Sequence, residues 1–332
     1  MRVGQSGSES RTIRGARAGP PPRRGNGEKG TVVLSIDAEL AWGFHDLDRL
    51  PERRIHAAPD AWYTLVSLLE EYDLPATWAI VGHLFLPECD GTHADHPLSP
   101  GWFERDPGSE TGRPAWFGRD LIDAVLDAKV DHEVASHSFS HVEFGHSETT
   151  REVAATEVGA SIDAAADLGL SLRSFVFPRN DVGHRDVLAA YGFESYRGTR
   201  PGRWYDDVPA PRLGKLVDAA LVRSPPPLVA PEPDEYGLVD VPASLCLFGF
   251  EGLVRSLVEP VGGDPVVRQA KLGIDDAVRS GGVFHLWLHP NDLVGKRERE
   301  RLRRVLSYLA RRRADADLTV KTMAEVAAEA RP

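Results

Sequence analysis

Short apolar runs alternate along this chain with longer segments in which apolar residues recur at helical spacing. Runs of four to eight apolar residues are typical of buried strands, whereas a period of 3.6 residues is typical of amphipathic helices. The predicted strands cover residues 31–36, 76–81, 133–136, 174–177, 194–196, 238–241, 283–288 and 318–320. The predicted helices cover residues 60–71, 119–129, 150–168, 185–191, 212–222, 264–279 and 296–312, with a last helix from Thr322.

The repeated order of strand, helix and strand predicts an α/β protein with a parallel sheet flanked by helices. An α/β barrel is the economical interpretation, but a doubly wound sheet gives the same alternation, and periodicity alone does not separate the two. Residues 87–118 interrupt the pattern with Pro, Gly, Asp, His and aromatic residues. Loops this long in compact domains are usually functional or disordered, and the aromatic residues favour an ordered insertion.

Composition sets the domain organisation. Because 42% of the 332 residues are hydrophobic, we expect one domain with a large core over residues 31–332. Residues 1–30 hold seven Lys or Arg and two Glu without apolar periodicity, which predicts a disordered basic tail. The longest apolar runs are strand-sized, so no transmembrane segment is expected.

Charge and cysteine content narrow the partners and the compartment. The net charge of −11 disfavours nucleic acid as a partner. Cys89 and Cys246 cannot form a disulfide framework and are expected to be free thiols. Arg23 and Arg24 suggest an export signal, but the apolar stretch that follows them is too short, and we expect a cytoplasmic protein. The sequence does not indicate an oligomeric state.

The most specific local signal is the pair His137 and His141, directly after the apolar run at 133–136. Histidines four residues apart share one face of a helical turn, where their imidazoles can converge on one metal ion. A chain with twelve histidines also produces this spacing by accident, so a metal site requires a third ligand.

Two carboxylates at the end of the first predicted strand can supply that ligand. Asp37 and Glu39 are two residues apart and project to the same side if the strand persists. Barrel and open-sheet enzymes keep their chemistry at the carboxyl ends of strands, so one acid could bind metal while the other moves protons. In the alternative interpretation, Glu39 opens a solvated loop and Asp37 caps the following segment.

Two more strands end in polar residues at the same predicted rim. His289 follows the strand at 283–288 and could donate a proton near neutral pH, whereas His285, inside that strand, fits a hydrogen-bonded core histidine. Arg179 follows the strand at 174–177, where its planar guanidinium could orient a carboxylate; a surface arginine is the alternative. We attribute the grouping of Cys89, His93 and His96 to the composition of the insertion rather than to a second zinc site.

Five motifs stand in order, each at the predicted end of a strand: LSIDAELAWG (34–43), LPATWAIVG (74–82), HEVASHSFSH (132–141), FVFPRN (175–180) and HLWLHP (285–290). This combination resembles the polysaccharide deacetylase family (NodB homology, carbohydrate esterase family 4-like). The resemblance implies a distorted (β/α) barrel, usually of seven strands, and metal-dependent hydrolysis of an N-acetyl group from an amino sugar.

The resemblance also implies roles for individual residues. His137 and His141 correspond to the metal-binding histidines, and His289 to the late histidine that protonates the leaving group. Arg179 lies near the position of the family's arginine, which steers the catalytic acid, although here it follows Pro178 instead of preceding a proline.

The first motif departs from the family pattern. Most members have two adjacent aspartates, a base followed by a metal ligand, whereas this chain has Asp37-Ala38-Glu39. Either Asp37 binds the metal and Glu39 acts as the base, or Asp37 is the base and the longer Glu39 reaches the metal. We favour the first assignment, because a Cα further into the loop gives Glu39 more freedom to approach a water molecule. A third possibility is that activity has been lost.

The sequence therefore predicts a hydrolase with a divalent metal, zinc by preference, on Asp37, His137 and His141. Glu39 is the expected base and His289 the expected acid, acting on an N-acetylated amino-sugar polysaccharide or its precursor. The alternatives are a cyclic or other non-sugar amide as substrate, or a catalytically dead carbohydrate-binding protein. Among the tryptophans, the insertion residues Trp102 and Trp116 are candidate walls of the substrate cleft, whereas Trp78 and Trp287, within predicted strands, fit core packing.

Overall fold

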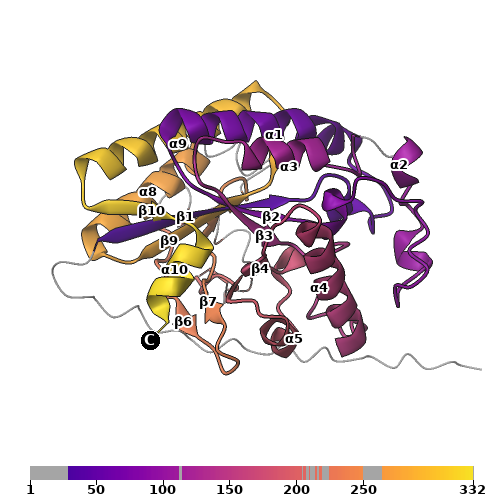
Figure 1. Ribbon diagram of the computed structural model, residues 1–332. Coiled ribbons are helices and arrows are strands. Elements are labelled where there is room, and N and C mark those ends of the chain that lie inside the picture. Colours follow the sequence, from indigo (N-terminus) through magenta and orange to yellow (C-terminus); the bar gives the residue numbers. More distant parts are fainter. Residues whose placement is uncertain are drawn as a thin grey trace, which may run out of the picture.

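Parallel strands form a curled wall with helices around it in the computed structural model (Figure 1). The structure describes residues 29–111, 114–203, 224–249 and 264–331, together with 205, 206, 209, 214, 217 and 218. Nearly all of the expected tail at 1–30 and most of the expected helix at 212–222 lie outside the described residues.

Seven stretches of the described chain make the wall of a distorted barrel. β1 lies between β2 and β9, and β3, β4 and β5 continue in parallel beyond β2. The segment 239–246 closes the wall, because its first part, β7, pairs with β5 and its last part, β8, pairs with β9. The barrel is thereby confirmed over the doubly wound sheet. The bounds are β1 (Gly30–Ala38), β2 (Thr77–Ile80), β3 (Glu133–Ser136), β4 (Ser174–Val176), β5 (Ser195–Arg197), β7 (Val239–Asp240), β8 (Leu245–Cys246) and β9 (Val283–Leu288).

β1 is the central strand. Its first half pairs with β10 (Leu318–Lys321), its second half pairs with β2, and β9 runs along its other edge. The short β6 (Glu232–Pro233) adds an antiparallel edge to β7. Because β1 is hydrogen-bonded on both sides, the residues at its carboxyl end are fixed more firmly than a loop would fix them.

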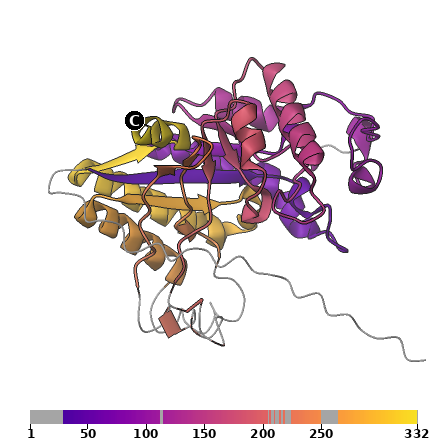
Figure 2. The same ribbon diagram turned by 90° about the horizontal axis from the view of Figure 1, so that it is seen from below.

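Helices cover the outside of the wall (Figures 1 and 2). α8 packs against β1 and β9, α9 packs against α8, and α1 packs against α9 and α3. On the other side α4 packs against β3 and α5. α1 begins eight residues before the expected helix at 60–71, since it continues through Pro59 and buries Ile55 and Ala58. None of the described helices is both long and apolar enough to cross a bilayer. The bounds are α1 (Glu52–Tyr72), α3 (Arg119–Leu126), α4 (Arg151–Ala166), α5 (Arg185–Ala190), α8 (Pro265–Ser280) and α9 (Lys296–Asp315).

The alternation of β1 divides its side chains between two environments. Leu34 and Ile36 join the core beneath the outer helices, whereas Val33 belongs to a smaller cluster inside the barrel. That inner cluster also contains Ala79, Ala135 and Val176, and Met323 of α10 (Met323–Ala330) packs against it. α10 therefore plugs one end of the barrel with apolar contacts, and the polar inward positions Ser35 and Asp37 lie toward the other end.

Stability should depend on pH through Asp240 at the end of β7. Burial raises the pKa of this carboxyl to about 7, against the hydrogen bond from the Gly198 backbone, which lowers it. The folded state thus holds the proton more tightly than the unfolded chain, and stability is lost as pH rises from about 4 to about 7.

We expect Asp240→Asn, which cannot ionise, to escape this loss. The free energy of unfolding of the variant, minus that of the parent, should increase by on the order of 2 kcal/mol between pH 5 and pH 8. Denaturant titrations at the two pH values measure the difference. An advantage that is equal at both values would contradict the assignment.

Candidate active site

Five ionisable side chains meet at the carboxyl ends of three strands. Asp37 lies near the end of β1 and Glu39 directly follows it, His137 and His141 follow β3, and His289 follows β9. The first four are buried and His289 is partly exposed. Since the carboxyl ends of parallel strands lie at one rim, residues far apart in sequence come within reach of one another.

Glu39 is the carboxylate that faces the two histidines. Its Oε1 lies 3.2 Å from Nε2 of both His137 and His141. Nδ1 of His137 lies 2.7 Å from the carbonyl oxygen of Val176, so Nδ1–H donates there and Nε2 is directed at Glu39. Two imidazole nitrogens and a carboxylate oxygen that converge in this way can bind one cation. The donor set therefore fits a divalent metal.

The two histidines converge from an irregular turn and not from the helical turn expected from their spacing. Ser138 and His141 have φ angles of 59° and 66°, in the left-handed region. Glu157 on α4 anchors this turn: its carboxylate accepts the Ser140 backbone N–H at 2.8 Å and the Ser140 hydroxyl at 2.5 Å. Although burial raises the pKa of Glu157, hydrogen bonds from His96 and Ser140 lower it overall.

Asp37 is held by Arg197, the last residue of β5. Two guanidinium nitrogens contact the two carboxylate oxygens at 2.5 and 2.6 Å, and the guanidinium is fully buried. Arg197 also donates to Ser35 Oγ at 3.0 Å and stacks over Trp287, with 4.4 Å from Cζ to the ring centroid. Burial opposes ionisation of Asp37, but Arg197 outweighs it and lowers the pKa.

Arg179 does not fill the carboxylate-orienting position expected of it. It lies at the surface, where its guanidinium contacts both carboxylate oxygens of Asp46 at 2.6 Å and Glu143 at 3.1 Å. Its neighbour Asn180 accepts a hydrogen bond from Arg197 at 3.0 Å. Sequence reasoning missed Arg197 because no motif surrounds it; its place directly after the predicted strand at 194–196 was the available signal.

His289 faces both carboxylates from the end of the neighbouring strand, β9. Its Nε2 lies 3.6 Å from Glu39 Oε1 and 3.8 Å from Asp37 Oδ2, and its Nδ1 lies 2.9 Å from Asp292 Oδ2. Arg54 on α1 forms an ion pair with Asp292 from the other side. Burial lowers the pKa of His289, but Glu39, Asp292 and Asp37 outweigh it and raise the pKa to about 9.

His285 is a core histidine, as predicted. Its Nε2 lies 2.8 Å from Ser35 Oγ and its Nδ1 lies 3.1 Å from the Val241 carbonyl oxygen, so both nitrogens are hydrogen-bonded. Burial lowers its pKa to about 3. His285 is therefore neutral and supports the layer beneath Asp37 and Arg197.

Both cysteines are free thiols, as expected.

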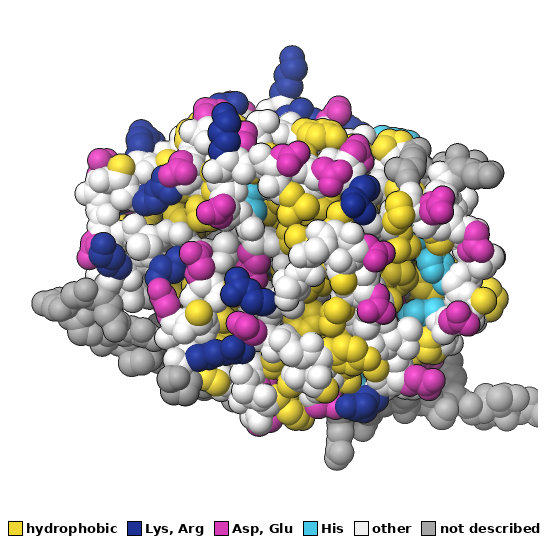
Figure 3. Space-filling view, in the orientation of Figure 1, with side chains coloured by type: hydrophobic (Ala, Val, Ile, Leu, Met, Phe, Trp, Pro, Cys, Tyr) yellow, Lys and Arg dark blue, Asp and Glu magenta, His cyan; other side chains and the backbone are white. Residues whose placement is uncertain are grey.

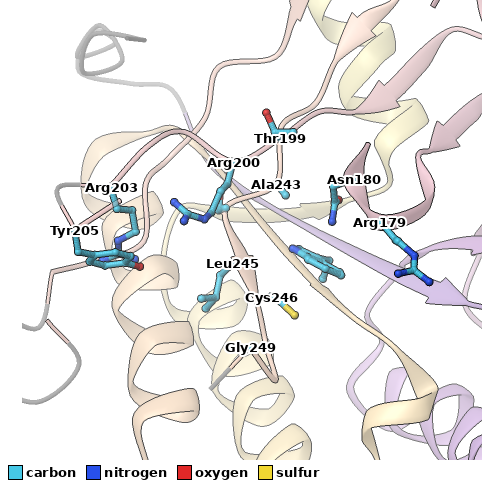
Figure 4. Close-up of a pocket in the computed structure, with 12 residues that line it drawn as sticks. Arg179, Asn180, Thr199, Arg200, Arg203, Tyr205, Ala243, Leu245, Cys246 and Gly249 are labelled. Carbon is cyan, nitrogen blue, oxygen red and sulfur yellow. The ribbon is translucent and has the colours of Figure 1, made fainter. Parts of the chain in front are cut away.

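Two adjoining cavities open at this rim. One, of about 310 Å³, is lined by Asp37, Glu39, His141 and His289, among others. The second, of about 370 Å³, adjoins it, since Trp287, Arg179 and Asn180 line both cavities. Figure 4 shows the second cavity, with Arg179 and Asn180 at one side of it. The rim therefore offers an elongated cleft with the reactive groups in one half.

Trp287 is the aromatic residue that lines both cavities, although its position in a strand suggested core packing. Of the two tryptophans expected to line the cleft, Trp102 donates its Nε1–H to the Ser140 carbonyl oxygen at 3.1 Å. Trp116 is buried, and its carbonyl accepts the indole N–H of Trp42 at 3.2 Å. These two residues fasten the insertion to the body, and neither is among the residues that line the two cavities.

No protein-family model and no curated protein matches the sequence. Solved structures do. A protein from Mycobacterium smegmatis that is assigned as a polysaccharide deacetylase is 15% identical in sequence to this chain. Its structure superposes with a TM-score of 0.60, and the match covers 95% of this chain and 93% of that one. The Puue allantoinase is 13% identical with a TM-score of 0.57, covering 97% of both chains. A protein from Pseudomonas aeruginosa PAO1 that is assigned as a polysaccharide deacetylase is 14% identical in sequence, with a TM-score of 0.56 and a match that covers 93% of both chains. These likenesses establish a barrel fold of the polysaccharide deacetylase type.

The two arginines should differ sharply in their contribution to stability. Arg197→Ala leaves the buried Asp37 carboxylate without its cation and should cost about 3–5 kcal/mol of unfolding free energy. Arg179→Ala removes an ion pair at the surface and should cost less than about 1 kcal/mol. Chemical denaturation of both variants checks the contrast. Equal losses would mean that the buried pair does not carry the stability assigned to it.

Proposed function

We propose that this protein is a metal-dependent hydrolase that removes N-acetyl groups from an amino-sugar polysaccharide or its precursor. The observation that carries the proposal is the placement of Glu39, His137 and His141 beside Asp37 and His289, at a rim where all of these except His137 line one cavity. The barrel fold shared with the solved deacetylase structures supports it. Residues 31–332 would form one catalytic domain.

In this proposal Glu39, His137 and His141 hold the metal. Zinc suits two imidazoles and a carboxylate. When bound, the metal would polarise the scissile carbonyl and lower the pKa of a water molecule. Asp37, the ligand favoured on sequence grounds, is reassigned as the base, because both its oxygens face Arg197 while Glu39 faces the histidines.

The remaining residues move protons. Arg197 keeps Asp37 ionised and fixed in orientation, so that a carboxylate oxygen can accept the proton of the attacking water. His289 donates its Nε2 proton to the departing amine, and Asp292 fixes the ring by accepting a hydrogen bond from Nδ1–H. Asp37 and His289 thus act as base and acid within 3.8 Å of each other.

The shape of the cleft favours a sugar polymer over a small amide. The two cavities together have room for more than the scissile group, and the indole of Trp287 lies between them as a surface for a sugar ring. On the face seen in Figure 3, basic and acidic side chains are interspersed, without the basic stripe that tracks a nucleic-acid backbone.

Elemental analysis, paired with acetate release from N-acetylglucosamine oligomers, tests the function. Chelator-sensitive acetate release is expected from the metal-loaded protein. Metal without acetate release, but with hydrolysis of a cyclic amide, would refute the amino-sugar substrate. Metal without turnover on either substrate would point to a binding protein.

Asp37→Asn and Glu39→Gln separate the two assignments of the first motif. Asp37→Asn should retain the metal at the Glu39 site and lose at least about 10²-fold in kcat, because the base is gone. Glu39→Gln and His137→Ala should lose that metal. If Asp37→Asn loses the metal and Glu39→Gln retains it, the assignment favoured from the sequence is correct, with Asp37 as the metal ligand and Glu39 as the base.

His289→Asn should lower kcat by roughly 10²–10⁴-fold with metal occupancy unchanged. Asparagine preserves polarity and approximate size but cannot supply the leaving-group proton. The steady-state rate with oligomeric substrate, measured beside the metal content, checks this. An unaltered rate would remove His289 from the mechanism.

A further inference from the structure

A second group of potential metal ligands lies outside the active site, in and beside the insertion. Its members are His83 of η2 (Gly82–Phe85), Cys89, His93 and Asp106, and their donor atoms all lie within 4.8 Å of one another. The grouping differs from the one considered on sequence grounds. His96 does not belong to it, because its Nε2 lies 3.1 Å from Glu157.

The donors converge on one carboxylate oxygen. Asp106 Oδ2 lies 2.7 Å from His93 Nε2, 3.0 Å from His83 Nε2 and 3.6 Å from Cys89 Sγ. Cys89 Sγ lies 3.2 Å from His93 Nε2. Zinc bonds of about 2.0–2.3 Å to tetrahedral ligands place donor atoms roughly 3.3–3.8 Å apart, so small outward shifts would admit the ion.

Backbone hydrogen bonds orient two of these donor groups toward the other two. The Gly91 backbone N–H donates to Cys89 Sγ at 3.2 Å, and the Gly108 backbone N–H donates to Asp106 Oδ1 at 3.0 Å, so Oδ2 points toward the group. Both glycines have positive φ, and a Cβ on Gly91 would lie 2.8 Å from the Asp106 carbonyl oxygen. Glycine is thus needed where the two ends of the loop approach.

His83 gives an independent indication of a ligand. The residue is completely buried; its Nε2 lies 3.0 Å from Asp106 Oδ2, but neither ring nitrogen has a hydrogen-bond partner of good geometry among the described residues. A buried imidazole without well-aligned hydrogen bonds is costly, and coordination through Nε2 would remove part of that cost. A thiolate and a carboxylate together balance the charge of a divalent cation, so the occupied site is neutral.

We infer that His83, Cys89, His93 and Asp106 bind a second zinc ion with a structural role. Four protein ligands leave no open position, which is typical of structural and not of catalytic zinc. The ion would join η2 to the loop that leads to α2 (Gly108–Thr111), at the outer edge of the molecule (Figures 1 and 2). It would thereby fasten the insertion, whose Trp102 contacts Ser140 between the two active-site histidines.

Cobalt substitution of the full-length protein tests the site without reference to turnover. A thiolate ligand gives Co²⁺ an intense charge-transfer absorption in the near ultraviolet, and the active-site donor set contains no thiolate. The parent protein should show this band. Cys89→Ser should abolish it, whereas the matched control Cys246→Ser should retain it.

Zinc stoichiometry supplies the second measurement. The parent should bind two equivalents of Zn²⁺, and His93→Ala should bind one, whereas the loop control His96→Ala should still bind two. A parent protein without the thiolate band, or a band that survives in Cys89→Ser, would overturn the inference. A separate variant tests the metal of the proposed function. The combined His137→Ala and His141→Ala variant should keep the thiolate band and lose one equivalent of zinc. If it retains both equivalents, only the active-site assignment is contradicted.

Discussion

The buried guanidinium of Arg197 is the interaction on which the rest of the site depends. A charge removed from water must be compensated where it lies, and here Asp37 supplies two oxygens, Ser35 a third and the Trp287 ring its face. Because both oxygens of Asp37 contact Arg197, this carboxylate is held away from His137 and His141, which Glu39 contacts instead. The position of the Arg197 guanidinium therefore decides which acid faces the histidines: Asp37 pairs with Arg197, and Glu39 faces His137 and His141.

Much of the architecture could be predicted because each strand and helix carries its own periodicity. The residues at the rim could also be predicted from the sequence, since Asp37, His137 and His289 each directly follow an apolar run. The roles of Arg197 and Glu157 could not be predicted, because each depends on a partner brought close only by the fold. For the same reason, the sequence could not decide which of the two acids faces the histidines.

The turn that carries the active-site histidines illustrates how tertiary contacts override local spacing. A separation of four residues suggests a helical turn, yet Glu157 binds Ser140 and the backbone adopts left-handed angles on either side. The same Glu157 also contacts His96 of the insertion. Glu157 thus links the insertion to the catalytic turn through side chains that no sequence motif connects.

The pairing of β1 also constrains how the chain reaches its native state. Thr31 and Thr319 share a hydrogen bond across 288 positions, and β9, which borders β1 over its length, is equally late in the sequence. Such pairings give the fold a high contact order, and closing loops of this length slows folding. During synthesis β1 would emerge from the ribosome long before its neighbours exist. The unpaired backbone N–H and C=O groups along its edges would stay open to intermolecular pairing until the last strands are translated.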